Sequence, residues 1–155
     1  MIRNVFLATV GVAIAATAVF AASHVGPFDG AIAARQAHMR LNGHNIGVLG
    51  AMAQGKIEYN ADAASAAAGN LAALAKMNQS TYWPQGSDSG ANANTRALPE
   101  LWNDFPGVIK ISKDLVAATT AMDSAAGVSL ASLQGAMGPL GGACGACHKA
   151  YRQPK

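Results

Sequence analysis

The sequence is poor in charge, in aromatic residues and in cysteine. Charged residues are 12% of the 155 residues, aromatic residues are 6%, and two cysteines occur. The formal net charge is +3, and no run of lysines and arginines concentrates it. Because a nucleic-acid partner is held mainly through its phosphates by a dense basic surface, the composition argues against such a partner. Neither an internal repeat nor the alternating apolar pattern of β-strands is present, which argues against a sheet.

The two cysteines lie together near the C-terminal end, and a histidine follows them directly, in the run Cys144-Gly145-Ala146-Cys147-His148. This C-x-x-C-H spacing is the attachment motif of a c-type haem. Two thiols at this spacing can both reach the vinyl groups on one edge of a porphyrin, and the histidine can offer its imidazole to the iron. The sequence therefore predicts one haem c, bound covalently through Cys144 and Cys147, with His148 as a metal ligand.

Three other interpretations of the motif are weaker. A redox-active dithiol belongs in a βαβ context, which the sequence lacks. A zinc site needs four ligands, and the other histidines (His24, His38 and His44) lie about a hundred residues upstream without paired spacing. A disulfide within the motif is geometrically awkward and leaves the histidine without a role.

The N-terminal 21 residues have the pattern of a cleaved secretory signal peptide. Arg3 gives a short positive start, residues 5–20 are uncharged and mostly apolar, and Ala21 suits cleavage. An uncleaved anchor is the alternative, but an apolar stretch of about 16 residues is shorter than the roughly 20 that span a bilayer. We expect residues 22–155 to form one mature domain without stable membrane insertion. Export to the bacterial periplasm agrees with the motif, because haem c is attached in an oxidising compartment.

Four stretches carry apolar residues at the three- and four-residue spacing of amphipathic helices: 32–54, 61–77, 98–121 and 130–151. We expect polar residues to cap three of these helices: Asp29, Asn60 and Ser129. Gly55 is expected to end the first helix, and Phe105-Pro106-Gly107 to break or kink the third. Residues 78–97 have no periodicity and form a long loop. The pattern predicts an all-α fold, an antiparallel four-helix bundle with covalent haem c near its C-terminus.

The apolar stripes indicate which helix faces turn inward. In the last stretch the stripe consists of Leu130, Leu133, Met137, Leu140, Cys144, Cys147 and Tyr151. In the first stretch it consists of Ile32, Met39, Ile46, Leu49 and Ala53, with Arg35 or Gln36 in the gap. Because both cysteines lie on the stripe of the last helix, the haem is expected to face the interior of the bundle.

Three segments resemble class II c-type cytochromes, the cytochrome c prime superfamily. They are the haem motif with its continuation to Arg152, the run Ala34-Arg35-Gln36-Ala37-His38-Met39, and the run Leu98-Pro99-Glu100-Leu101-Trp102. The resemblance implies a four-helix bundle in which the two cysteines form thioethers and the motif histidine is the proximal ligand.

The resemblance also implies roles for residues outside the motif. It places Arg152 near the proximal face of the haem, and Arg35 and Gln36 at the haem edge, where a guanidinium can pair with a propionate. For Arg35 an ordinary surface charge is the alternative. His38, about 100° round the helix from Met39, is expected to point away from the haem face as a surface or satisfied histidine.

Met39 matches the distal position, on the side of the iron opposite His148, where the family divides. In low-spin members a methionine here ligates the iron and the protein carries electrons. In high-spin members the iron is five-coordinate and is associated with nitric oxide and carbon monoxide. The segment 39–52 and Pro139 look more like the low-spin branch, and Gly43 would let the helix lie close to a porphyrin.

The sequence therefore predicts a periplasmic one-electron carrier, with His148 and Met39 as the metal ligands. Binding of nitric oxide or carbon monoxide at a five-coordinate iron is the alternative. An enzyme is not expected, because no distal His and Arg pair is placed to split a peroxide. The expected partners are redox proteins of the periplasm, bound transiently, and the family resemblance allows a homodimer.

Overall fold

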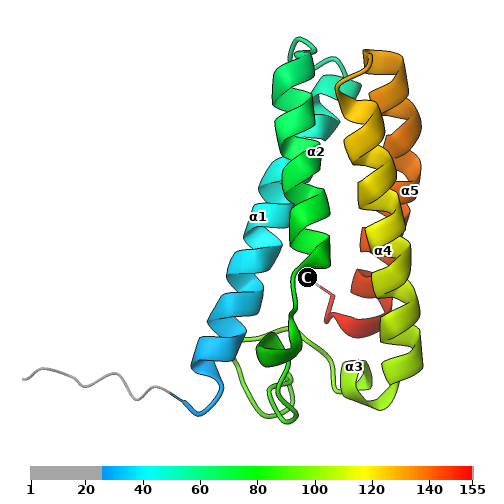
Figure 1. The fold of residues 1–155 in the computed structure, drawn as a ribbon. Coiled ribbons are helices and arrows are strands. Elements are labelled where there is room, and N and C mark those ends of the chain that lie inside the picture. Colours follow the sequence, from blue (N-terminus) through cyan, green and yellow to red (C-terminus); the bar gives the residue numbers. More distant parts are fainter. Residues whose placement is uncertain (1–25, 155) are drawn as a thin grey trace, which may run out of the picture.

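The computed structural model describes residues 26–154, which form a bundle of four long helices running up, down, up and down (Figure 1). The elements are α1 (Asp29–Ala53), α2 (Ala61–Lys76), the short 3-10 helix η1 (Ser80–Tyr82), α3 (Glu100–Asn103), α4 (Phe105–Ala126) and α5 (Leu130–Tyr151). Within the described residues the one β feature is an isolated bridge between Ala97 and Arg152. The predicted antiparallel four-helix bundle is confirmed. The predicted signal peptide lies outside the described residues.

Local sequence signals set several helix ends as predicted. Asn60 Oδ1 accepts a hydrogen bond from the amide of Ala63 at 2.8 Å, and Ser129 Oγ accepts one from the amide of Ser132 at 3.1 Å. Gly55 has φ +67°, the left-handed conformation that favours glycine, and follows the last turn of α1 directly. These ends are readable from sequence because each needs only residues within one turn.

The predicted cap at Asp29 is wrong. Phe28 occupies the cap position of α1 without a side-chain hydrogen bond, and Asp29 is the first helical residue. The Asp29 carboxylate instead accepts hydrogen bonds from the Gly26 amide at 2.6 Å and from Asn94 Nδ2 at 2.8 Å. Asp29 therefore lies one residue past the cap position, and its carboxylate binds groups outside the helix.

The break in the third predicted helix is confirmed, but it lies one residue earlier than the Phe105-Pro106-Gly107 run. Helix α3 ends at Asn103, and α4 begins at Phe105 with Pro106 in its first turn, where proline is tolerated. Asp104 between them is the cap, since its carboxylate accepts a hydrogen bond from the Gly107 amide at 3.1 Å.

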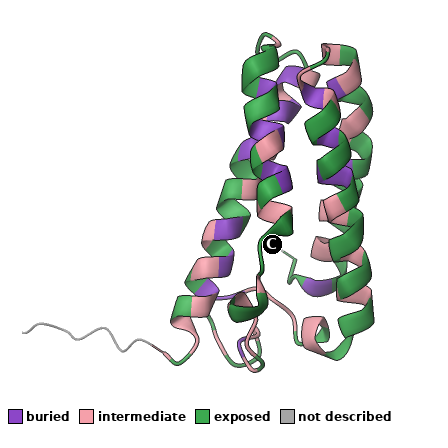
Figure 2. Ribbon diagram, viewed as in Figure 1, coloured by how far each residue is buried: buried purple, intermediate pink, exposed green. Residues whose placement is uncertain are grey.

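The hydrophobic core fills one half of the bundle. This half contains the C-terminal parts of α1 and α4 and the N-terminal parts of α2 and α5, where buried residues concentrate (Figure 2). Its buried residues are Leu49, Met52, Ala64, Ala67, Ala68, Leu71, Met122, Ala126, Leu133 and Leu140. Alanines on α2 allow the helices to approach closely there. None of the helices within residues 26–154 is long and apolar enough to cross a membrane.

The buried stripe of α1 follows the predicted one at Ile32, Arg35 and Leu49, and the partly buried Ile46 and Ala53 pack against the core. The buried residues include Ile32, Arg35, His38, Asn45, Leu49 and Met52, whereas Met39 is 40% exposed. Polar side chains are buried because other elements provide their partners. Asn45, for example, donates to the carbonyl of Leu41 at 2.8 Å and accepts from Asn70 Nδ2 of α2 at 3.1 Å.

Candidate functional site

The haem-attachment motif lies in the last two turns of α5. Cys144 and Cys147 are three residues apart, so they lie near one another on one side of the helix, and both are free and half-buried. Burial raises the pKa of both thiols above the ordinary value. The nearby charge of Arg152 opposes this rise at Cys147. The two thiols are thus presented together, as attachment to one porphyrin edge requires.

The surroundings of His148 favour the neutral imidazole. Its pKa is lowered first by burial and then by the positive charges of Arg152 and Arg96. A neutral imidazole is the form that donates an electron pair to a metal. This effect puts the charge of Arg152 near His148, while the predicted place of Arg152 at the proximal face of the haem stays a prediction.

Arg96 was missed by sequence reasoning, because the backbone brings it to the site from the long loop. The Gln153 amide donates to the carbonyl of Arg96 at 2.9 Å, and the Leu98 amide donates to that of Tyr151 at 2.9 Å. These two bonds flank the bridge between Ala97 and Arg152. The pairing joins chain segments more than fifty residues apart, which no local pattern could reveal.

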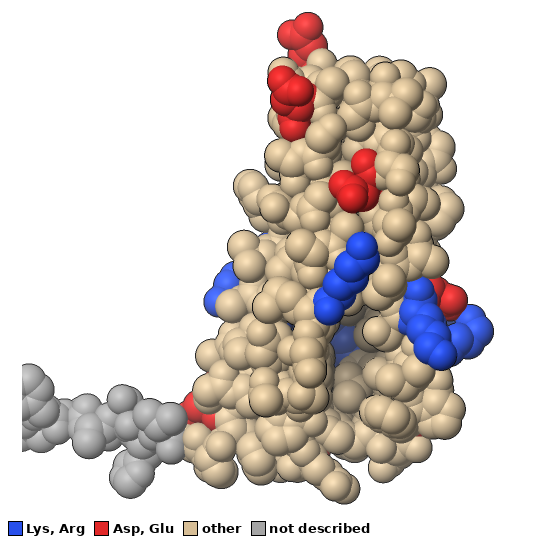
Figure 3. Space-filling model, in the orientation of Figure 1, with Lys and Arg blue, Asp and Glu red and all other residues tan. Residues whose placement is uncertain are grey.

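The half of the bundle that holds the motif has few buried side chains. Within the described helices, α4 has no buried residue before Ala118, and α5 has none between Leu140 and Tyr151. Large apolar side chains at this end are exposed, among them Phe105 and Ile109 on α4. The surface is hollowed here, with basic side-chain atoms visible inside (Figure 3). A large, flat, apolar group such as a haem fits the composition of these helix faces.

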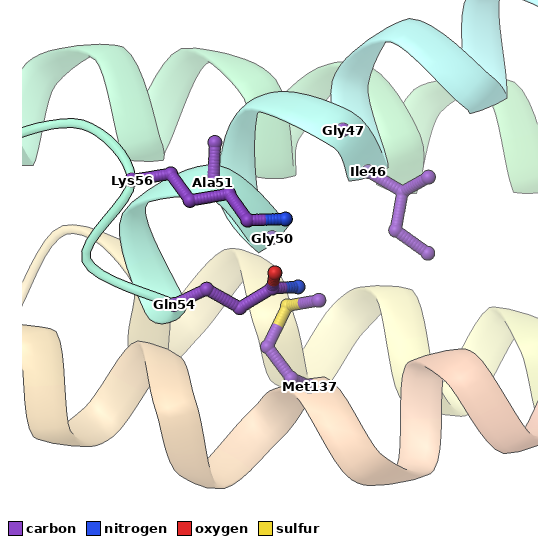
Figure 4. Close-up of a pocket in the computed structure, with 7 residues that line it drawn as sticks. All are labelled: Ile46, Gly47, Gly50, Ala51, Gln54, Lys56 and Met137. Atoms are coloured by element: carbon purple, nitrogen blue, oxygen red, sulfur yellow. The ribbon is translucent and has the colours of Figure 1, made fainter.

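Two contacts fix the register between α1 and α5. Gln134 Nε2 of α5 donates to the carbonyl of Ala53 in α1 at 2.8 Å. A β-carbon at Gly50 would lie 3.7 Å from Met137 Cε. Figure 4 shows Met137 extending from α5 towards α1 at this level. The face of α1 that carries Gly50 therefore looks towards α5.

This register brings Met39 level with His148. Met39 lies eleven residues before Gly50 in α1, and His148 lies eleven residues after Met137 in the antiparallel α5. Eleven residues are about three helical turns, roughly 16 Å, so Met39 lies within about 20° of the Gly50 face. Its side chain is 40% exposed. The predicted distal and proximal residues therefore lie at the same level on facing sides of the two helices.

Arg35 is buried, so the surface-charge alternative is wrong. Its side chain is 3% exposed and donates to the carbonyl of Tyr82 at 3.1 Å, to Ser87 Oγ at 2.7 Å and O at 2.5 Å, and to Thr95 Oγ1 at 2.8 Å. Burial lowers its pKa from the ordinary value, and Asp88 partly opposes this shift. The predicted contact of Arg35 with the haem edge stays a prediction.

The two tryptophans of the chain complete the surroundings of Arg35. The guanidinium carbon lies 4.9 Å from the ring centroid of Trp83 and 5.9 Å from that of Trp102, close enough for cation–π attraction. Trp102 Nε1 donates to the carbonyl of Trp83 at 3.0 Å. Sequence reasoning did not connect these aromatic residues with Arg35, because Trp83 lies in a segment without periodicity.

Gln36 and His38 also contact the long loop. Gln36 is exposed and donates from Nε2 to the carbonyl of Asn94 at 2.7 Å, while its predicted haem contact stays a prediction. His38 is buried, with its ring centroid 6.1 Å from that of Tyr82, and burial lowers its pKa. Of the two expected roles, a surface or a satisfied histidine, the burial of His38 excludes the first.

A four-helix bundle whose last helix ends in a haem-attachment motif defines a c-type cytochrome of the bundle class. The family model for cytochrome c' matches residues 30–152, and the chain belongs to this family. Members bind haem c covalently, and Cys144 and Cys147 are the cysteines that attach it in this protein. The protein is thus a haem c protein that carries electrons or binds ligands.

Individual relatives agree with this assignment. Cytochrome c-554 of Cereibacter sphaeroides is 42% identical over 122 residues, which cover 79% of this chain and 80% of the relative. A cytochrome c' of the same species is 34% identical over 151 residues, 97% of each chain. The solved structure of a cytochrome c' from Rhodobacter Spheriodes superposes with a TM-score of 0.80 at 31% identity, covering 82% of this chain and 98% of the other.

Proposed function

We propose that the protein is an exported one-electron carrier whose haem iron is ligated by His148 and Met39. The observation that carries this proposal is the register between α1 and α5, which puts Met39 level with His148 on the face of α1 that looks towards α5. The hollow that Figure 3 shows on one face of the half of the bundle with the motif supports it.

His148 and Met39 would have different roles in such a carrier. A bound haem c supplies an iron that changes between the ferric and ferrous states by one electron. His148 would offer a neutral imidazole, as its lowered pKa favours. Met39 would offer a thioether sulfur, a soft donor that favours ferrous iron and raises the reduction potential. Because both side chains can serve both states, little would have to rearrange when an electron moves.

Location and partners follow from the same proposal. The N-terminal segment, with its positive start and apolar stretch, supports export to the periplasm. We expect transient contacts with redox proteins there, and no enzymatic turnover. A homodimer is a further expectation, since one solved cytochrome c', 29% identical with a TM-score of 0.73, shows ligand-controlled dimer dissociation.

The absorption spectrum of the purified holoprotein tests the proposal. Ferric and ferrous spectra should be low-spin, with a weak long-wavelength sulfur–iron band, and should not change on addition of carbon monoxide. Met39→Ala should remove the band and open the iron to carbon monoxide. Met77→Ala is the matched control, because Met77 is also exposed but lies after α2.

A high-spin wild-type spectrum that shifts on addition of carbon monoxide would contradict the proposal. The function would then be binding of nitric oxide or carbon monoxide at a five-coordinate iron, with Met39 lining the distal side.

A further inference from the structure

We propose that Arg35 is a positioning residue: it fastens the segment 78–98 to α1 and thereby holds α1 at a set distance from the haem-bearing end of α5. This inference rests on the proposed function, since that distance decides whether Met39 can reach the iron. It assigns to Arg35 a role that needs no contact with a propionate.

The first step is the attachment of the segment to α1. Arg35 makes four hydrogen bonds, and all of them go to residues 82–95. A guanidinium has five N–H donors, and within residues 26–154 the remaining one, on Nε, makes no hydrogen bond. Most of the hydrogen-bonding capacity of Arg35 is therefore used by the loop.

A second, weaker attachment lies on the exposed side of the same helix. Gln36 Nε2 donates to the carbonyl of Asn94, and Asn94 Nδ2 donates to Asp29 Oδ1. Both bonds are exposed to water. They contribute less than the buried bonds of Arg35, because water competes for exposed donors and acceptors.

The next step is the attachment of the segment to α5. The Ser89 amide donates to the carbonyl of Ala97 at 2.8 Å. This bond links residues 82–95, which contain the partners of Arg35, to the residues that follow them in the chain. The Leu98 amide then donates to the carbonyl of Tyr151, and the Gln153 amide to that of Arg96, each at 2.9 Å. Backbone hydrogen bonds thus continue from the Arg35 partners to the helix that carries His148.

The last step is that, within the described residues, few protein contacts besides these join the two helices at this end, where a bound haem would be the other link. The core residues that pack α1 against α5 belong to the other half of the bundle, as Figure 2 shows. Arg35 lies one turn before Met39 on the same helix, so a shift of α1 at Arg35 moves Met39 with it. The distance between the facing helices at the site would therefore depend on the loop and on Arg35 as well as on the haem itself.

The test compares Arg35→Gln and Arg35→Lys with Arg40→Gln in the holoprotein. Arg40 is an exposed charge on the same helix, and its side chain donates no hydrogen bond within the described residues, so it controls for loss of charge. Amide hydrogen exchange is followed at Ser87, Ser89 and Leu98, together with the sulfur–iron band. Spin labels on His44→Cys and Lys149→Cys report the distance between α1 and α5.

Both Arg35 variants should raise exchange at these amides by about tenfold or more, because lysine cannot reproduce a planar set of four hydrogen bonds. They should also broaden the label distance and weaken the sulfur–iron band, whereas Arg40→Gln should match the wild type. If either variant fails to fold, Thr95→Val removes one acceptor at similar volume and should show the same changes more weakly.

Two results would overturn the inference. One is that Arg35→Lys behaves as wild type while Arg35→Gln does not, which would show that only the charge matters, as in pairing with a propionate. The other is faster exchange in the loop with an unchanged label distance. A high-spin wild-type spectrum would refute the proposed function alone, since loop exchange and label distance would still test Arg35.

Discussion

Tyr151, the last residue of α5, donates a hydrogen bond from its hydroxyl to Asp104 Oδ2 at 2.6 Å. The same carboxylate caps α4 by accepting a bond from the Gly107 amide. The end of the haem-bearing helix is thereby joined to the start of its neighbour. This bond lowers the pKa of Asp104 and, as the largest cause, raises the pKa of Tyr151 to about 12.

Tyr151→Phe should lower the melting temperature in a pH-dependent way. The Asp104 contribution is present above its ordinary pKa of 3.8 and is lost as pH falls through the lower pKa of the folded protein. The Tyr151 contribution is present below its ordinary pKa of 10.0 and is lost as pH rises through about 12. The difference in melting temperature from wild type should be largest near neutral pH and shrink at both extremes. A difference that is constant across pH would contradict this account.

Gly107→Ala should destabilise the protein by about 1–3 kcal/mol, the usual cost of overpacking. A β-carbon at this position would overlap the Asp104 carboxylate and the Tyr151 hydroxyl. Denaturant unfolding measures the change. Gly135→Ala in α5 is the control, because a β-carbon there meets no described atom within 4 Å and alanine favours a helix. Equal stability of the two variants would rule out the overlap.

Leu133→Ala should lower the stability of the protein without changing the haem site. Leu133 is fully buried in the filled half of the bundle, so its truncation should cost about 2–5 kcal/mol of unfolding free energy. The absorption spectrum of the folded variant should stay that of wild type, because the motif lies at the other end of α5. Leu41→Ala, at a 53% exposed position, should change stability by less than about 0.5 kcal/mol. A changed spectrum in Leu133→Ala would show that the two halves are coupled.

The features that the sequence determined by itself are those that depend on neighbouring residues. The spacing of Cys144, Cys147 and His148 is enough to specify a haem attachment, because one helix segment presents all three side chains. The helix ends at Asn60, Ser129 and Gly55 could also be predicted from the sequence, since each cap uses partners within one turn. The three- and four-residue spacing of apolar residues was then enough to predict the four-helix bundle.

The tertiary structure alone decided which face of α1 is buried and what covers it. Arg35 and His38 are buried because their partners come from residues 82–95, a segment whose lack of periodicity hides its contacts. The carboxylate of Asp29, the first residue of α1, likewise accepts a hydrogen bond from Asn94 of this segment. Met39 likewise lies level with His148 because of the contacts that Ala53 and Gly50 make with α5. Periodicity reports that a helix has a buried side, but long-range packing and hydrogen bonding choose the residues that occupy it.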